Sequence, residues 1–113
     1  LIISGGYNIY PKEIEVVLDE QPGIDESAVI GVPHPDYGET PIGVIVPSRE
    51  LKPNLNVITE NLKQSIARYK HPKKIIIVKQ LPRNAMGKVQ KNILRSEYKS
   101  LFTAWILNYY YKN

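Results

Sequence analysis

Three short apolar runs, each next to or close to a proline, set the limits on what this chain can fold into. They lie at residues 28–32, 42–46 and 74–78. Each has the length of a strand, and the middle run, IGVIV, is apolar throughout, which is typical of a strand covered on both faces. We therefore expect a three-stranded sheet with residues 42–46 at its centre and residues 74–78 also buried.

Two stretches with helical spacing of apolar residues alternate with these runs. The first follows Pro11, a residue suited to the first turn of a helix. Its stripe consists of Ile14, Val17 and Leu18. The second can be capped by Asn54 or Asn56. Its stripe consists of Ile58, Leu62, Ile66 and Tyr69. With a strand at residues 2–3, the order β-α-β-β-α-β predicts an α+β fold with helices on one face of a small sheet.

Both ends of the chain carry further elements. The strand at residues 2–3 runs into a Ser-Gly-Gly turn, residues 33–39 and 81–88 read as loops, and a last helix begins near Gln90. Its apolar positions are Ile93, Leu94, Tyr98, Leu101, Phe102, Trp105 and Ile106, with further aromatic residues to Tyr111. We expect this helix to pack on this domain or on a neighbour. A basic helix on a membrane surface and a tail that is not native to the protein are the alternatives.

The composition excludes several classes of protein. The 113 residues suffice for one domain, and the absence of cysteine excludes disulfides, thiolate metal sites and a cysteine nucleophile. His34 and His71 are far apart and each lies beside proline, so no metal site is expected. No apolar run could span a bilayer and no signal peptide is visible, so we expect a cytoplasmic protein. The start, LIISGG, lies inside an apolar run without Met, which indicates a piece of a longer chain.

The charge is divided unevenly between the two halves. Residues 1–51 carry two basic and nine acidic side chains, whereas residues 52–113 carry thirteen basic and two acidic ones. The second half can therefore attract a polyanion such as ATP, CoA, RNA or anionic lipid. Solvated surface lysines are the simpler interpretation of the same pattern.

Few motifs suggest chemistry by themselves. Gly87 and Lys88 do not form a Walker loop, because position 82 is proline and position 89 is valine. Glu13 and Glu15 point to different sides of a helix, so we expect solvated carboxylates and no acid–base pair. Lys88 remains as a long, charged side chain on a loop, after a glycine that permits close approach to a ligand.

Four segments, in order, resemble those of a known family. They are IISGGYNIYPKEIE, GVPHPDYGETPIGVIV, ARYKHPKK and LPRNAMGKVQKNILR, and together they extend from residue 1 to about residue 99. Their order and spacing resemble the C-terminal domain of the AMP-forming adenylate superfamily, which includes acyl-CoA synthetases, luciferases and peptide-synthetase adenylation domains. GYNIYPKEIE is most similar to the acyl-CoA synthetase branch.

The resemblance implies an ATP-dependent acid–CoA ligase of two domains. Residues 1–100 would be its mobile lid and residues 101–113 a helical or non-native tail. ATP, CoA and a carboxylic acid would be the substrates. The large N-terminal adenylation domain, which would be this domain's partner and would bind Mg²⁺, lies outside the chain. We therefore expect the isolated chain to be inactive.

The resemblance also implies roles for particular residues. Lys88 matches the adenylation lysine, and a loop suits it because it must enter the active site for one half-reaction and leave for the next. The turn that would line the tunnel for the pantetheine arm of CoA consists of Ser4, Gly5, Gly6 and Tyr7. The candidates for contacts with CoA phosphates are Lys63, Arg68, Lys70 and Lys73. The residues expected to shape a turn are Asp36, Gly38 and Glu39.

Two departures and one rival interpretation accompany the resemblance. Asn84 stands where the family usually has threonine, which puts one polar contact in doubt, and the tail from about Leu101 has no counterpart. The segment from Pro82 to Lys88 has the P-x-x-x-x-G-K form that protein acetyltransferases recognise in this family, so Lys88 is a candidate for acetylation. The rival is a non-catalytic basic module for RNA or a protein partner. Its support is thin, because Tyr69 is the only aromatic residue among the central lysines.

Overall fold

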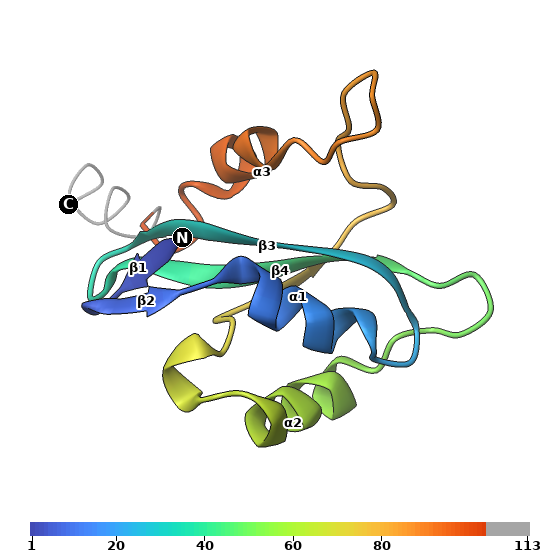
Figure 1. The fold of residues 1–113 in the computed structure, drawn as a ribbon, viewed down its shortest axis with the longest axis horizontal. Helices are drawn as coiled ribbons and strands as arrows, with labels where there is room; N and C mark the ends of the chain where they lie inside the picture. The colour runs from blue at the N-terminus through green and yellow to red at the C-terminus, as the bar shows by residue number, and fades with distance from the viewer. Residues whose placement is uncertain (104–113) are drawn as a thin grey trace, which may run out of the picture.

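The computed structural model describes residues 1–103 (Figure 1). The elements, in chain order, are β1 (Ile2–Ser4), β2 (Tyr7–Ile9), α1 (Pro11–Asp19), β3 (Ile24–His34), β4 (Gly38–Pro47), α2 (Leu55–Ser65), the 3₁₀ turn η1 (Arg68–Lys70), β5 (Ile75–Ile77) and α3 (Lys91–Tyr98). They form a two-stranded sheet, β1–β2, and a three-stranded sheet in the order β3–β4–β5. The predicted α+β class and three-stranded sheet are confirmed.

Strand β4 lies at the centre of the larger sheet, as its continuous apolar run predicted. It pairs antiparallel with β3, where Ile30 lies opposite Ile42, and parallel with β5. Val44 and Ile45 are fully buried. The strand predicted within residues 74–78 is present as β5, but the expectation that it is buried is wrong, because β5 is a short edge strand and its Ile77 is 48% exposed.

Helices α1 and α2 cover one face of this sheet, as predicted (Figure 1). Helix α1 begins at Pro11 and buries Ile14 and Leu18. Helix α2 is capped by Asn54, whose side-chain oxygen accepts two backbone N–H groups of the first turn. The core between these helices and the sheet consists of Ile2, Ile9, Ile14, Leu18, Ile24, Val29, Ile45, Ile58 and Leu62.

Helix α3 packs on the opposite face, so the helices lie on both faces of the sheet rather than on one (Figure 1). Leu94 is buried there beside Leu81 against β3 and β4. The helix ends at Tyr98, and Leu101 and Phe102 lie in the turn that follows and pack against the same core. The predicted helical positions Trp105 and Ile106 and the aromatic tail lie outside the described residues.

The predicted strand at residues 2–3 and the Ser-Gly-Gly turn are present, and together with a second strand they form a hairpin. Its second strand, β2, was not predicted, because it is only three residues long and contains a single buried side chain. The Glu39 carboxylate accepts the N–H of Ile3 at 2.9 Å and so ties the hairpin to the start of β4. Gly31 makes room for that carboxylate, since a Cβ there would come within 2.7 Å of the Glu39 carboxyl carbon.

Two predicted boundaries differ from the structure. The loop expected at residues 33–39 is shorter, because β3 runs to His34 and β4 begins at Gly38, whose φ of +79° closes the turn. Tyr69 does not belong to the stripe of α2, because the helix ends before Ile66 and Tyr69 lies in η1.

Candidate functional site

The predicted Ser-Gly-Gly-Tyr segment is a tight turn at the tip of the β1–β2 hairpin. Gly5 and Gly6 have φ of +56° and +86°, the left-handed conformation that a two-residue hairpin turn of type I′ requires and that glycine favours. The Gly5 N–H donates to the Tyr37 carbonyl at 2.9 Å, which holds the tip against the turn between β3 and β4. Ser4 is buried and Tyr7 is exposed.

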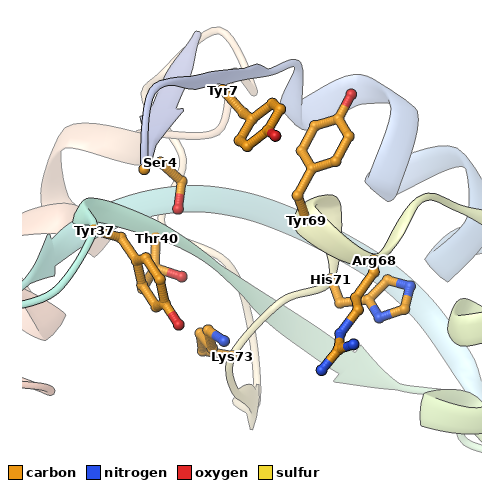
Figure 2. Close-up of a pocket in the computed structure, with 9 residues that line it drawn as sticks. Ser4, Tyr7, Tyr37, Thr40, Arg68, Tyr69, His71 and Lys73 are labelled. Atoms are coloured by element: carbon orange, nitrogen blue, oxygen red, sulfur yellow. The ribbon is translucent and has the colours of Figure 1, made fainter.

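A pocket of about 480 Å³ opens beside this turn (Figure 2). It is lined by Ser4, Gly5, Tyr7, Tyr37, Thr40, Arg68, Tyr69, His71 and Lys73. Figure 2 shows Ser4, Tyr37 and Thr40 on one side of the pocket and Arg68 and His71 on the other. Cations and aromatic faces together suit a ligand that carries phosphate and a planar ring.

Aromatic contacts join the segments that form the pocket. The rings of Tyr7 and Tyr69 are stacked with centroids 4.5 Å apart, which connects the N-terminal hairpin to η1. The Lys73 Nζ lies 4.9 Å from the centroid of the Tyr37 ring, within the range of a cation–π interaction. Three segments that are distant in sequence therefore meet around one cavity, namely residues 4–7, 37–40 and 68–73.

Two of the four predicted phosphate-binding cations, Arg68 and Lys73, line this pocket. Lys70 is engaged elsewhere, because its Nζ lies 2.6 Å from the Glu13 carboxylate. The hydrogen bond to Glu13 raises the pKa of Lys70. Arg68 and Lys73 are therefore better placed than Lys70 to meet an anion in the pocket.

Lys63 lies in a neighbouring pocket of about 250 Å³ that shares His71 and Lys73 with the first. Its Nζ is 3.2 Å from the carboxylate of Glu60, and both side chains are more than half exposed. Such a surface ion pair is weak and easily exchanged. A role for Lys63 in binding CoA therefore remains a prediction.

Tyr37 and Thr40 were not singled out from the sequence. Thr40 is 1% exposed, and its hydroxyl has no hydrogen-bond partner among the described residues. Buried hydroxyl groups usually have a hydrogen-bond partner, so the Thr40 hydroxyl is an unusual, unpartnered polar group in the pocket wall. The only sequence signal for Tyr37 and Thr40 is that they flank Gly38 and Glu39, two residues expected to shape a turn.

Lys88 lies on a hydrogen-bonded loop between β5 and α3. Arg83 and Val89 form an isolated antiparallel bridge that closes the loop, and the φ of Gly87, +85°, turns the chain before Lys88. The Asn84 N–H donates to the Lys88 carbonyl at 2.9 Å, and the Asn84 side-chain oxygen accepts the Lys88 N–H at 2.9 Å. The Lys88 side chain itself is exposed. Asn84, which stands where the family usually has threonine, thus makes polar contacts within the loop.

The Lys88 loop and the glycine turn project from different sides of the domain (Figure 1). The loop connects β5 to the helix on one face of the sheet, whereas the turn and its pocket lie beside η1, which follows the helix on the other face. The domain therefore carries the Lys88 loop and the glycine turn on two separate surfaces and does not bring them into one site.

Glu15 is not the solvated carboxylate that was expected. It accepts the N–H of Val29 at 2.9 Å, pairs with the Lys91 Nζ at 2.8 Å, and its side chain is only 13% exposed. Val29 lies on the outer edge of the sheet, where a backbone N–H needs a partner from outside the sheet. The role of Glu15 is therefore structural, and it connects α1, β3 and α3.

Within residues 1–103, no group of three or more His, Cys, Asp or Glu side chains could hold a metal ion. None of the helices described there is long and apolar enough to cross a membrane.

The fold and these features define a small α+β domain that carries its candidate groups on separate surfaces. The chain belongs to the family of the AMP-binding enzyme C-terminal domain, whose sequence model matches residues 13–88. The matched segment ends at Lys88, the residue singled out on the loop. The family resemblance predicted from the sequence is confirmed.

Two of the curated proteins that this chain resembles are CoA ligases. Long-chain-fatty-acid–CoA ligase FadD13 of Mycobacterium tuberculosis is 43% identical over 98 residues, which are 87% of this chain and 19% of that protein. The 2-succinylbenzoate–CoA ligase of Oceanobacillus iheyensis is 48% identical over 94 residues, 83% of this chain and 19% of that protein. The crystal structure of ATP-bound MatB from Rhodopseudomonas palustris matches with a TM-score of 0.88 and 48% identity, over 91% of this chain and 20% of that one. The chain thus spans about a fifth of the length of these relatives.

Proposed function

We propose that this chain is the C-terminal domain of an AMP-forming acid–CoA ligase and serves the two half-reactions with its two surfaces. In the first, a carboxylate attacks the α-phosphorus of ATP, giving an acyl-adenylate and pyrophosphate. In the second, the CoA thiol attacks the acyl carbon, giving the thioester and AMP. The observation that carries the proposal is the separation of the Lys88 loop from the glycine turn in a domain of this family.

Lys88 serves the first half-reaction. Its ammonium group lies near the substrate carboxylate and the α-phosphate, where negative charge moves as the acyl-adenylate forms. A fixed positive charge at that place stabilises the transition state more than the ground state. The exposure of the side chain fits this role, because the lysine must reach into a site that the large domain provides.

The Gly5-Gly6 turn serves the second half-reaction. After adenylation the domain rotates, and the turn forms part of the tunnel through which the pantetheine arm reaches the adenylate. Glycine fits this place because it adopts the left-handed backbone and presents no side chain to the passing ligand. Ser4 and Tyr7 flank the tunnel from the two strands of the hairpin.

The pocket beside the turn holds the phosphate-bearing end of CoA. Replacing both Arg68 and Lys73 with alanine is expected to raise the KM for CoA about tenfold, since charged hydrogen bonds contribute about 1.5–3 kcal/mol and water screens part of that here. The KM for ATP should not change. Steady-state kinetics of the full-length ligase measure both constants.

A double Lys12→Ala and Lys52→Ala variant is the control for lost charge, because both lysines are exposed and lie outside the pocket. An unchanged KM for CoA in the Arg68 and Lys73 variant would contradict this assignment. If Lys63→Ala raised the KM for CoA instead, the phosphates would lie in the neighbouring pocket that Lys63 lines.

Lys88 is also a target for a protein acetyltransferase. Acetylation would remove the charge on which the first half-reaction depends. We expect mass spectrometry of the native protein to find Lys88 acetylated under conditions that acetylate other members of the family, with a matching loss of adenylation. Finding Lys88 always unmodified under those conditions would count against this regulation.

The remaining partners lie outside this chain. The large N-terminal domain supplies the nucleotide pocket and the Mg²⁺ that accompanies ATP, so the isolated chain is expected to be inactive. The cytoplasmic location expected from the sequence is part of the same proposal.

The rival assignment, a basic module for RNA or a protein partner, gains no support from the relatives named above. Assaying the two half-reactions separately in Lys88 and Gly5 variants tests the proposal.

A further inference from the structure

We propose that Asn84 is a positioning residue for Lys88, and this inference rests on the proposed function of the lysine. The Asn84 side-chain oxygen accepts two backbone N–H groups, that of Lys88 at 2.9 Å and that of Met86 at 3.0 Å. One oxygen therefore fixes the backbone at the residue from which the lysine side chain departs. The backbone held in this way sets the point and the direction from which the Lys88 side chain leaves the loop.

The loop is held by polar contacts rather than by apolar packing, and the hydrogen bonds of Asn84 are among them. Residues 83–88 are all exposed, and Met86 at the tip is 93% exposed, so no apolar packing supports the loop. The backbone adds two hydrogen bonds at the same residue, from the Asn84 N–H to the Lys88 carbonyl and from the Gly87 N–H to the Asn84 carbonyl, both at 2.9 Å. Asparagine is suited to this place, because its short side chain readily bonds to backbone groups a few residues further on.

Arg83 fastens the same loop to the sheet. Its guanidinium donates to the Gly87 carbonyl at 2.6 Å and forms an ion pair with Glu26 on β3. The Gln90 N–H donates to the Pro82 carbonyl at 2.8 Å and closes the base of the loop. The loop that bears Lys88 is therefore fastened to the sheet. This arrangement fits the proposal that Lys88 enters and leaves the active site by rotation of the whole domain rather than by flexing of the loop.

The test uses the full-length ligase with Asn84→Ala. We expect the kcat for acyl-adenylate formation to fall about tenfold, since a displacement of about 1 Å at a reacting group can cost up to about 10²-fold. The KM values for ATP and for the acid should stay within about twofold, because Asn84 does not bind either substrate. The rate of thioester formation from supplied acyl-adenylate should not change.

Two further variants separate positioning from a general loss of structure. Asn84→Thr keeps an oxygen that can accept hydrogen bonds and should restore most of the rate. Asn56→Ala removes an exposed asparagine on α2, away from both surfaces, and should leave both half-reactions unchanged. A rise in KM at constant kcat, an equal loss in both half-reactions, or a rate for Asn84→Ala within twofold of the unmodified enzyme would each overturn the inference.

A double variant shows whether Asn84 acts through Lys88. In a Lys88→Ala background, Asn84→Ala should cause no further loss of adenylation, because there is no ammonium group left to position. An additional tenfold loss in that background would overturn the inference while leaving the role of Lys88 intact. If Lys88→Ala itself left adenylation unchanged, the proposed function would fail, and the two failures are thus distinguishable.

Discussion

Replacing Lys88 with alanine in the full-length ligase is expected to slow acyl-adenylate formation by about 10²–10³-fold. This is the range for removing one fixed group that stabilises charge in a transition state. Thioester formation from supplied acyl-adenylate should stay near the rate of the unmodified enzyme, because the proposed rotation takes the lysine out of the site before that step. ATP–pyrophosphate exchange measures the first half-reaction, and release of AMP from supplied adenylate measures the second.

A matched control distinguishes this role from a general effect of charge. Lys79→Ala removes an exposed lysine that lies outside the loop of residues 83–89, and it should leave both half-reactions unchanged. Adenylation by Lys88→Ala at a rate close to that of the unmodified enzyme would contradict the assignment. An equal loss of both half-reactions would instead indicate a misfolded domain.

Replacing Gly5 with valine is expected to give the opposite pattern. The φ of Gly5, +56°, is unfavourable for a β-branched residue, and the new side chain would occupy space that the proposal reserves for the pantetheine arm. We expect thioester formation to fall on the order of 10²-fold, as for other misplacements of a reacting group, while adenylation stays within about threefold. The same pair of half-reaction assays measures this.

Backbone strain is the competing explanation for the Gly5 variant, since a left-handed backbone costs a residue with a side chain about 1–2 kcal/mol. Gly38→Val is the matched control, because Gly38 has φ of +79° and its Cβ would meet no atom within 4 Å. Thermal unfolding should show similar destabilisation of both variants. If Gly38→Val lost thioester formation as severely as Gly5→Val, strain rather than obstruction of the tunnel would explain the effect.

The parts of the fold that the sequence predicted are those in which local signals agree. Pro11 begins a helix, Asn54 caps one, and residues 42–46 form the central strand, because each pattern has one stable local outcome. Strand β2 was not predicted, and the burial of β5 was overestimated. Strands of three residues depend on their neighbours more than on their own residues.

The same distinction applies to the candidate site. Lys88 and the glycine turn were found through motifs that are continuous in sequence. The pocket was not found as a unit, because the stacking of Tyr7 on Tyr69 and the position of Thr40 arise from segments that meet only in the folded domain. Glu15 was misjudged for a similar reason, since its partners Val29 and Lys91 come from two other elements.

The Lys88 loop and the glycine turn are each held in place by contacts within the domain. Arg83 and Asn84 hold the Lys88 loop on one side of the sheet. The hydrogen bond from the Gly5 N–H to the Tyr37 carbonyl holds the glycine turn against the turn between β3 and β4. Because hydrogen bonds within the domain hold both the loop and the turn, each can keep its shape while the domain moves. Rotation of the domain as a whole would then exchange one surface for the other at the active site.

The measurement that tests this claim most directly is the ratio of the two half-reaction rates, compared between the Lys88→Ala and Gly5→Val forms of the full-length ligase. Two separate surfaces predict that the ratio of adenylation to thioester formation falls about 10²-fold or more in the first variant and rises about 10²-fold in the second. A ratio that stays constant in both variants would contradict a division of labour between the lysine loop and the glycine turn.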